Sequence, residues 1–252
     1  MRVLYINAIE SPVSGEILKA GTLKGLRSAT ILNSAEELEF VSYDIFYGRT
    51  QPAGALGRFA HSRHFDAVIL SGSERNTSNA SDPWLAEYFR GLKDLLSLDS
   101  DPSQWMGPQF PILGICFGHQ ALACLLGGET APFKYRADVL QISPLAAARE
   151  HAVFRSLLTK YPKLDVVVTH GDHVVRSPAG FRVSFSSDYC LNQGMIHDQW
   201  PIVTLQSHPE ITSALKTDQA EAEDWKHVEP SQMDNHHGPS ILGKFLDWAA
   251  TQ

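Results

Sequence analysis

The stretch ILGICFGHQALACLLGG, residues 112–128, decides the fold of this chain. Its first residues are apolar and suit a strand, and its second half is an apolar run that stops at two glycines, as helices often do. Between them, G-I-C-F-G at 114–118 has the spacing of a nucleophile elbow, in which a strand turns sharply into a helix through a strained central residue. The stretch therefore predicts a strand over 111–115, a tight turn at Cys116 and a helix through Leu126.

Cys116 is expected to be reactive in such a turn. Its sulfur would project from the carboxyl edge of the sheet at a helix N-terminus, where the partial positive charge favours the thiolate. The backbone N–H of Phe117 would point toward an oxyanion formed beside that sulfur. A cysteine that only fills space in the core is the alternative. That alternative is our interpretation of Cys124, within the helix, and of Cys190, in a strand or turn.

The second motif is TLQSHPE, residues 204–210, in which an apolar strand ends at His208. Glu210 follows across Pro209, and the proline fixes the backbone between two ionisable groups. The carboxylate could then hold one imidazole nitrogen while the other nitrogen faces the sulfur. A histidine on a surface loop is the alternative. Together the two motifs predict a Cys, His and Glu catalytic set.

A third, weaker motif is LSGSERN, residues 70–76, at the end of a predicted strand. A glycine-bearing loop at the carboxyl edge of a sheet can aim backbone N–H groups at an anion. Gly72 and Ser73 are therefore candidates for the other half of an oxyanion hole. A plain turn from strand to loop would explain the same residues.

The rest of the sequence indicates an α/β fold. Apolar, β-branched runs over 2–8, 38–46 and 65–73 predict parallel strands, with room for helices between them. A helix is expected from Pro83 to about Leu98, with Asp82 as its N-cap. Beyond residue 128, strands are predicted over 138–143, 165–172, 181–187 and 201–207. They are separated by turns rather than by helices, which implies mixed or antiparallel pairing. A closing helix is expected over 240–250.

No repeat, low-complexity tract or linker divides the chain, so we expect a single domain over 1–252. Within it, the acidic, histidine-containing stretch 217–239 has little periodicity and is expected to be a surface excursion or a lid. The formal net charge of −7 and the lack of a Lys/Arg cluster argue against nucleic acid or an anionic membrane as the main partner. A small-molecule substrate is expected instead.

The three cysteines form no C-x-x-C pair and are odd in number, so they suggest neither a disulfide framework nor a zinc ribbon. A reducing cytoplasm fits them best. The first residues read as a strand rather than as a signal peptide, and no window approaches the roughly 20 apolar residues of a membrane span. We expect a cytoplasmic protein without a membrane segment.

No metal or cofactor site is expected from the histidines. His119, just after the turn, and His173, beside a probable substrate loop, are given structural roles. His236 and His237 are expected to lie in a solvated loop, because no properly spaced partner ligands accompany them.

With these motifs, the chain resembles the class I glutamine amidotransferase family, of the Cys-His-Glu triad type. GICFGHQ matches the nucleophile motif of that family and HPE its His-Glu pair, while THGDHV at 169–174 looks like the Ser-His-Gly-Asp segment of GMP-synthase-type members. The resemblance spans roughly 1–215. It implies a three-layer, flavodoxin-like α/β fold, in which helices flank a mostly parallel central sheet with a smaller antiparallel extension.

The resemblance also implies roles for the catalytic residues. The γ-glutamyl group would be transferred to Cys116, His208 would move the proton from the thiol to the departing amine, and Glu210 would orient His208. Amide groups of Gly72 or Ser73, together with Phe117, would hold the oxyanion. Water would then cleave the thioester to give glutamate.

The substrate residues follow from the same resemblance. Gln120 and the loop of His170, Gly171 and Asp172 correspond to positions that hold the α-amino and α-carboxylate groups of glutamine. Two departures stand out: residues 71–73 read Ser-Gly-Ser where many members have Pro-Gly-Gly, and a serine precedes the catalytic histidine where Phe or Gly is commoner.

The expected function is a glutaminase that delivers ammonia to a separate synthetase or acceptor subunit, since no ATP-binding synthetase domain follows residue 252. One alternative is a free-standing γ-glutamyl peptidase that acts on γ-glutamyl compounds such as glutathione conjugates. Another is a non-catalytic regulatory subunit. An α/β-hydrolase is disfavoured, because its acid precedes its histidine along the chain, whereas Glu210 follows His208.

Overall fold

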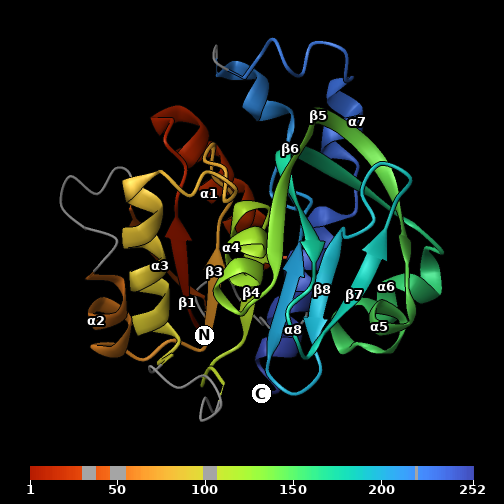
Figure 1. Ribbon diagram of the computed structural model, residues 1–252. Coiled ribbons are helices and arrows are strands. Elements are labelled where there is room, and N and C mark those ends of the chain that lie inside the picture. Colours follow the sequence, from red (N-terminus) through yellow and green to blue (C-terminus); the bar gives the residue numbers. More distant parts are fainter. Residues whose placement is uncertain (30–37, 46–54, 99–106, 219–220) are drawn as a thin grey trace.

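A computed structural model describes residues 1–29, 38–45, 55–98, 107–218 and 221–252. Within them, nine strands form one sheet in the order β2-β1-β3-β4-β9-β8-β7-β5-β6 (Figure 1). The strands are β1 (Arg2–Asn7), β2 (Glu39–Asp44), β3 (Ala67–Leu70), β4 (Ile112–Ile115), β5 (Glu129–Pro144), β6 (Leu164–Arg176), β7 (Phe181–Ser186), β8 (Gly194–His197) and β9 (Ile202–Leu205). The helices are α1 (Pro12–Leu26), α2 (Leu56–His61), α3 (Pro83–Leu95), α4 (Phe117–Leu125), α5 (Ala146–Glu150), α6 (Ala152–Lys160), the 3₁₀ helix η4 (Ser213–Thr217), α7 (Pro230–Asp234) and α8 (Gly238–Ala249).

The first half of the sheet is parallel, as the sequence predicts. Strands β2, β1, β3, β4 and β9 all run in one direction. Successive side chains of a strand point to opposite faces: Val3 and Tyr5 join a core with residues of α1, α6 and α8, and Leu4 and Ile6 join a core with residues of α2, α3 and α4. The expected three-layer α/β architecture is confirmed.

The second half of the sheet, β8, β7, β5 and β6, pairs antiparallel. The expected antiparallel extension is therefore present, but its two outer strands are longer than 138–143 and 165–172. Their extra pairs, such as Thr130 with Val174, lie beyond a register shift between Pro132 and Arg136. Most side chains of β5 from 129 to 136 are exposed or half-buried, so no apolar alternation marked this part of the strand.

The predicted helix boundaries agree with the structure near their capping residues. The Asp82 side chain accepts a hydrogen bond from Trp84 N at 3.0 Å, and Pro83 occupies the first turn of α3. After α4, Gly127 takes a φ of +92°, which ends the helix in a conformation that favours glycine. No helix in the described ranges combines the length and apolar character that crossing a membrane requires.

The stretch 217–239 packs on the domain more closely than a surface excursion would. In its described part, Trp225 and Met233 are fully buried, in a cluster with Leu18 of α1 and with Ile211. His236 is also buried and hydrogen-bonds Ile211 O at 2.9 Å, while the ring of His237 accepts a hydrogen bond from the backbone of β6. The expectation of a solvated loop for these histidines was wrong, because their rings replace water as partners of backbone groups.

Candidate active site

Cys116 lies in a strained turn between β4 and α4. Its φ of +49° and ψ of −100° are rare for a residue with a side chain. Its N–H donates to Leu205 O of β9 at 2.7 Å. A Cβ on Gly118 would lie 2.6 Å from Leu70 O, and one on Gly114 would lie 3.0 Å from the Gly118 backbone. The elbow predicted from the glycine spacing is confirmed, and both glycines are needed for its close contacts.

The Cys116 sulfur is almost completely buried and has two polar neighbours. Sγ donates to Thr169 O of β6 at 3.5 Å and accepts a hydrogen bond from Gln206 Nε2 at 3.6 Å. Gln206 was not predicted from the sequence as part of the site. Since alternate residues of an extended chain project to the same side, its position two residues before His208 could have indicated that both face the nucleophile.

His208 and Glu210 form a buried pair beside the sulfur. His208 Nδ1 lies 2.8 Å from Glu210 Oε1, and the two side chains are 4% and 0% exposed. The carboxylate holds the proton on Nδ1, so Nε2 is the nitrogen left for the side-chain hydrogen bond to Cys116. Burial lowers the pKa of His208, but the charges of Cys116 and Glu210 outweigh burial and raise it well above 6.5.

The loop after β3 lies against the same imidazole. A Cβ on Gly72 would come within 2.6 Å of His208 Cε1, so the ring can approach only because residue 72 is glycine. Ser71 ties this loop to the elbow, since its carbonyl accepts from Gly118 N at 3.1 Å. The structure thus brings Gly72 next to the catalytic candidates. The roles of Gly72, Ser73 and Phe117 as oxyanion donors remain predictions.

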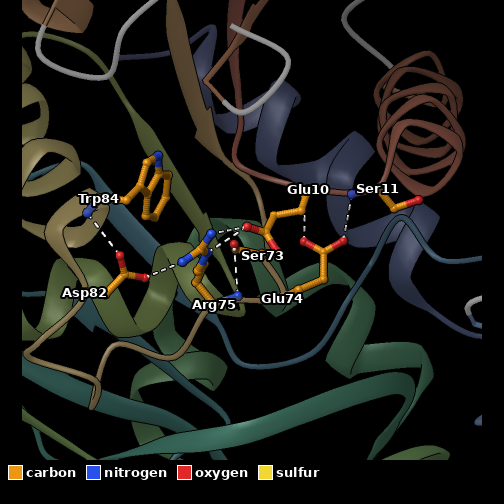
Figure 2. A network of polar contacts seen from close by, with 7 residues as sticks. All are labelled: Glu10, Ser11, Ser73, Glu74, Arg75, Asp82 and Trp84. Atoms are coloured by element: carbon orange, nitrogen blue, oxygen red, sulfur yellow. Dashed lines mark hydrogen bonds and ion pairs between the residues drawn. The ribbon is translucent and has the colours of Figure 1, made fainter. Parts of the chain in front are cut away.

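A network of charged residues fixes the continuation of this loop (Figure 2). Arg75 pairs with Glu10 and with Asp82, the N-cap of α3. Glu74 accepts hydrogen bonds from the N–H groups of Glu10 and Ser11, at 2.7 and 3.2 Å, where the chain enters α1. The loop beside Cys116 is therefore held by contacts at the N-termini of α1 and α3.

Three of the predicted substrate residues, Gln120, His170 and Asp172, contact one another. Gln120 Nε2 and His170 Nδ1 both donate to Asp172 O, at 2.9 and 2.8 Å. The Asp172 carboxylate accepts from Ser78 N at 2.8 Å and from Ser78 Oγ at 3.0 Å, so it anchors the loop after β3. Burial lowers the pKa of His170 to about 4. Its ring is therefore neutral, and its Nε2 is an acceptor.

Gln120 also connects this group to the nucleophile. Its Nε2 lies 3.3 Å from Gln206 Oε1, and Gln206 is completely buried. With its oxygen facing Gln120, the Gln206 amide must turn its nitrogen toward the sulfur. The structure thus gives Gln120 a part in orienting Gln206, besides the substrate contact predicted for it.

His119 and His173 both contact other side chains of the fold. His119 is buried and bonds Thr204 Oγ1 at 2.8 Å, and burial lowers its pKa to about 3. His173 packs on the ring of Phe133. Across the described ranges, no group of three or more His, Cys, Asp or Glu side chains is arranged to hold a metal ion.

The candidate site contains a pocket of about 500 Å³. Cys116 and His208 lie in its wall. The other described lining residues are Ile9, Ser14, Leu18, Ser73, Glu74, Arg75, Asn76, Gln120, Phe133, Tyr135, Thr169, His170, Gly171, Asp172, Ile211, Leu215, Glu221 and Asp224. Such a volume accommodates a small organic molecule.

Residues 60–224 match the family model of glutamine amidotransferase class-I. Over 150 residues the chain is 32% identical to proteins named GMP synthase (glutamine-hydrolyzing) from Mannheimia succiniciproducens and Haemophilus ducreyi; each match covers 58% of this chain. The matches cover 25% of the relatives, so the chain spans about a quarter of the length of these curated proteins.

Solved structures share the fold. A glutamine amidotransferase from Thermotoga maritima superposes with a TM-score of 0.68 at 20% identity, over 100% of this chain and 99% of that one. A glutamine amido transferase from Methylobacillus flagellatus gives a TM-score of 0.60 at 18% identity, over 100% of this chain and 92% of that one.

Proposed function

Because the chain belongs to the class I glutamine amidotransferase family, we propose that it hydrolyses the γ-amide of glutamine through a thioester on Cys116 and releases ammonia. The observation that carries this proposal is the buried set of Cys116, His208 and Glu210, in which a strained nucleophile faces an imidazole oriented by a carboxylate. Such a set suits acyl transfer.

The reaction has two steps at the sulfur. In the first, His208 Nε2 takes the thiol proton, Sγ bonds to the γ-carbonyl carbon, and the C–N bond breaks as the nitrogen receives the proton from His208. In the second, His208 takes a proton from water, the hydroxide adds to the carbonyl carbon, and the C–S bond breaks. Glutamate leaves and the thiol recovers its proton. The amides of Gly72, or Ser73, and Phe117 hold the oxyanion in both steps.

The ammonia acceptor is proposed to be a separate protein. The curated relatives named GMP synthase are about four times as long as the part that this chain matches. A partner that docks at the pocket would receive ammonia before it is lost to solvent. This partner is inferred from the likeness to those longer proteins.

A second candidate function is hydrolysis of substituted γ-glutamyl amides. The observation that favours it is the pocket, whose lining includes the apolar side chains Leu18 and Leu215 besides Gln120. Ammonia as a leaving group needs none of that apolar wall. The chemistry at Cys116 is the same in both functions, and only the leaving amine differs.

The first experiment measures glutamate release by the full chain from glutamine and from a γ-glutamyl dipeptide, with Cys116→Ala and Cys124→Ala as a matched pair. Loss of the nucleophile is expected to lower kcat by at least about 10³-fold, whereas Cys124→Ala retains activity. If Cys116→Ala still released glutamate at the wild-type rate, the thioester mechanism would be wrong.

A further inference from the structure

The pocket has a wall whose function is not explained by glutamine hydrolysis. It is formed by the chain between β1 and α1, by α1 itself, by the chain that follows Glu210 as far as η4 and by the described residues that follow 220. We name it the α1 wall, and it consists of Ile9, Leu18, Ile211, Leu215, Glu221 and Asp224. Its four apolar members are at most 4% exposed and belong to the cluster that contains Trp225, so they form a fixed surface.

The α1 wall adjoins the His208 and Glu210 pair. Ile211 follows that pair directly in the chain, and α1 packs against this segment so closely that a Cβ on Gly21 would clash with Glu210 O. A leaving amine that takes its proton from His208 would therefore have the α1 wall beside it.

The charges around the pocket are predominantly negative. Among the described lining residues, the carboxylates are Glu74, Asp172, Glu221 and Asp224, and the permanently cationic side chain is Arg75, which pairs with Glu10 and Asp82. Burial, and then the neighbouring charges of Glu74, Asp218 and Asp224, raise the pKa of Glu221. A bound cation would relieve this repulsion.

His208 also lines the pocket beside this wall. It is buried, and a side-chain hydrogen bond to Cys116 is among the contacts that raise its pKa. The proton on its imidazole is the one that a leaving amine receives. The apolar members of the α1 wall can then contact the carbon chain of that amine, while Glu221 and Asp224, whose Oδ2 accepts from Tyr135 at 2.6 Å, supply negative charge beside it.

We propose that the α1 wall is the subsite for the leaving amine, and that it fits the γ-glutamyl amide of an aliphatic amine that carries a second, cationic group. The proposal rests on the Cys116 chemistry proposed above. The γ-carbonyl carbon bonds to Sγ, the C–N bond breaks, the amine departs with the proton from His208, and water later releases glutamate.

The test compares four donors with the full chain: glutamine and the γ-glutamyl amides of butylamine, diaminobutane and aminobutyrate, which are neutral, cationic and anionic. We expect kcat/KM to be highest for the cationic amide and lowest for the anionic one. In the double variant Glu221→Gln, Asp224→Asn, the ratio of kcat/KM for the cationic and neutral amides should fall roughly fivefold. Glu223→Gln removes an exposed carboxylate outside the pocket and should leave that ratio unchanged.

The outcomes separate this inference from the proposed function. If glutamine is consumed but the cationic amide has no advantage over the anionic one, or keeps its advantage in the double variant, the subsite is wrong and the Cys116 chemistry stands. If the wild-type chain consumes no donor at all, both proposals fail. Thermal unfolding of each variant shows whether a fall in the ratio of kcat/KM values arises from loss of the folded structure.

Discussion

The Cys116 sulfur has two hydrogen-bond neighbours of opposite kind. Thr169 O accepts from the thiol, whereas Gln206 Nε2 donates to the sulfur. When the thiol loses its proton, the carbonyl contact becomes repulsive and the amide contact becomes a charge-assisted hydrogen bond, which is stronger. Gln206 is therefore a positioning residue that stabilises the thiolate.

We predict that Gln206→Met slows alkylation of Cys116 by iodoacetamide about tenfold at about pH 6, because a hydrogen bond to a charged group contributes about 1.5 kcal/mol or more. Gln141→Met, at a solvent-exposed position on β5, serves as the control. Equal alkylation rates in Gln206→Met and the wild type would exclude this role.

The charge state of His208 also belongs to the scale of single residues. The pKa of His208 is raised in the folded protein. The folded protein therefore binds more protons than the unfolded chain at pH values between 6.5 and the folded-state pKa. The resulting stability is fully present below 6.5 and is lost as the pH rises through the folded pKa.

We predict that Glu210→Gln weakens this pH dependence, because the anion that helps to raise the pKa of His208 is removed. NMR titration of the His208 ring should give a lower pKa in the variant than in the wild type. Urea unfolding at several pH values should show a shallower decline above pH 6.5. An unchanged titration would mean that Glu210 only fills space.

At the scale of elements, the elbow depends on how closely α4 approaches β3. Gly118 lies in the first turn of α4, and its missing side chain lets the helix contact Leu70 O. Gly127, just after α4, has free space around its Cα but a positive φ. The two glycines thus serve different purposes, one steric and one conformational.

Gly118→Ala is expected to lower the free energy of unfolding by about 2 kcal/mol net. Overpacking costs about 3 kcal/mol, and the better helix propensity of alanine returns about 1 kcal/mol. Gly127→Ala should cost about 1 kcal/mol and leave Cys116 reactive, whereas Gly118→Ala should also slow its alkylation. Urea unfolding and iodoacetamide labelling measure both effects, and the same loss in both variants would contradict the steric explanation.

At the scale of the whole molecule, the features that could be predicted from the sequence are those that local patterns determine. The buried parallel strands, the Asp82 cap and the turn at Cys116 follow from apolar runs, capping residues and glycine spacing. The outer part of β5 and the burial of Trp225 depend on contacts between distant segments. Such contacts leave no periodic signal in either partner, so they could not be predicted from the sequence. The contact between Gln206 and Cys116 did have a local signal, the spacing of Gln206 from His208.

The place of β9 in the sheet has a consequence for biosynthesis. β9 lies between β4 and β8, in the middle of the sheet, although the ribosome makes it after the eight other strands of the described residues. Until it is inserted, β4 has an unpaired edge, Cys116 N lacks its partner on Leu205, and His208 is not yet beside the thiol. If Cys116 is the nucleophile that we propose, a nascent chain keeps it unactivated until synthesis has passed His208. The insertion of a late central strand is also expected to limit the rate of folding.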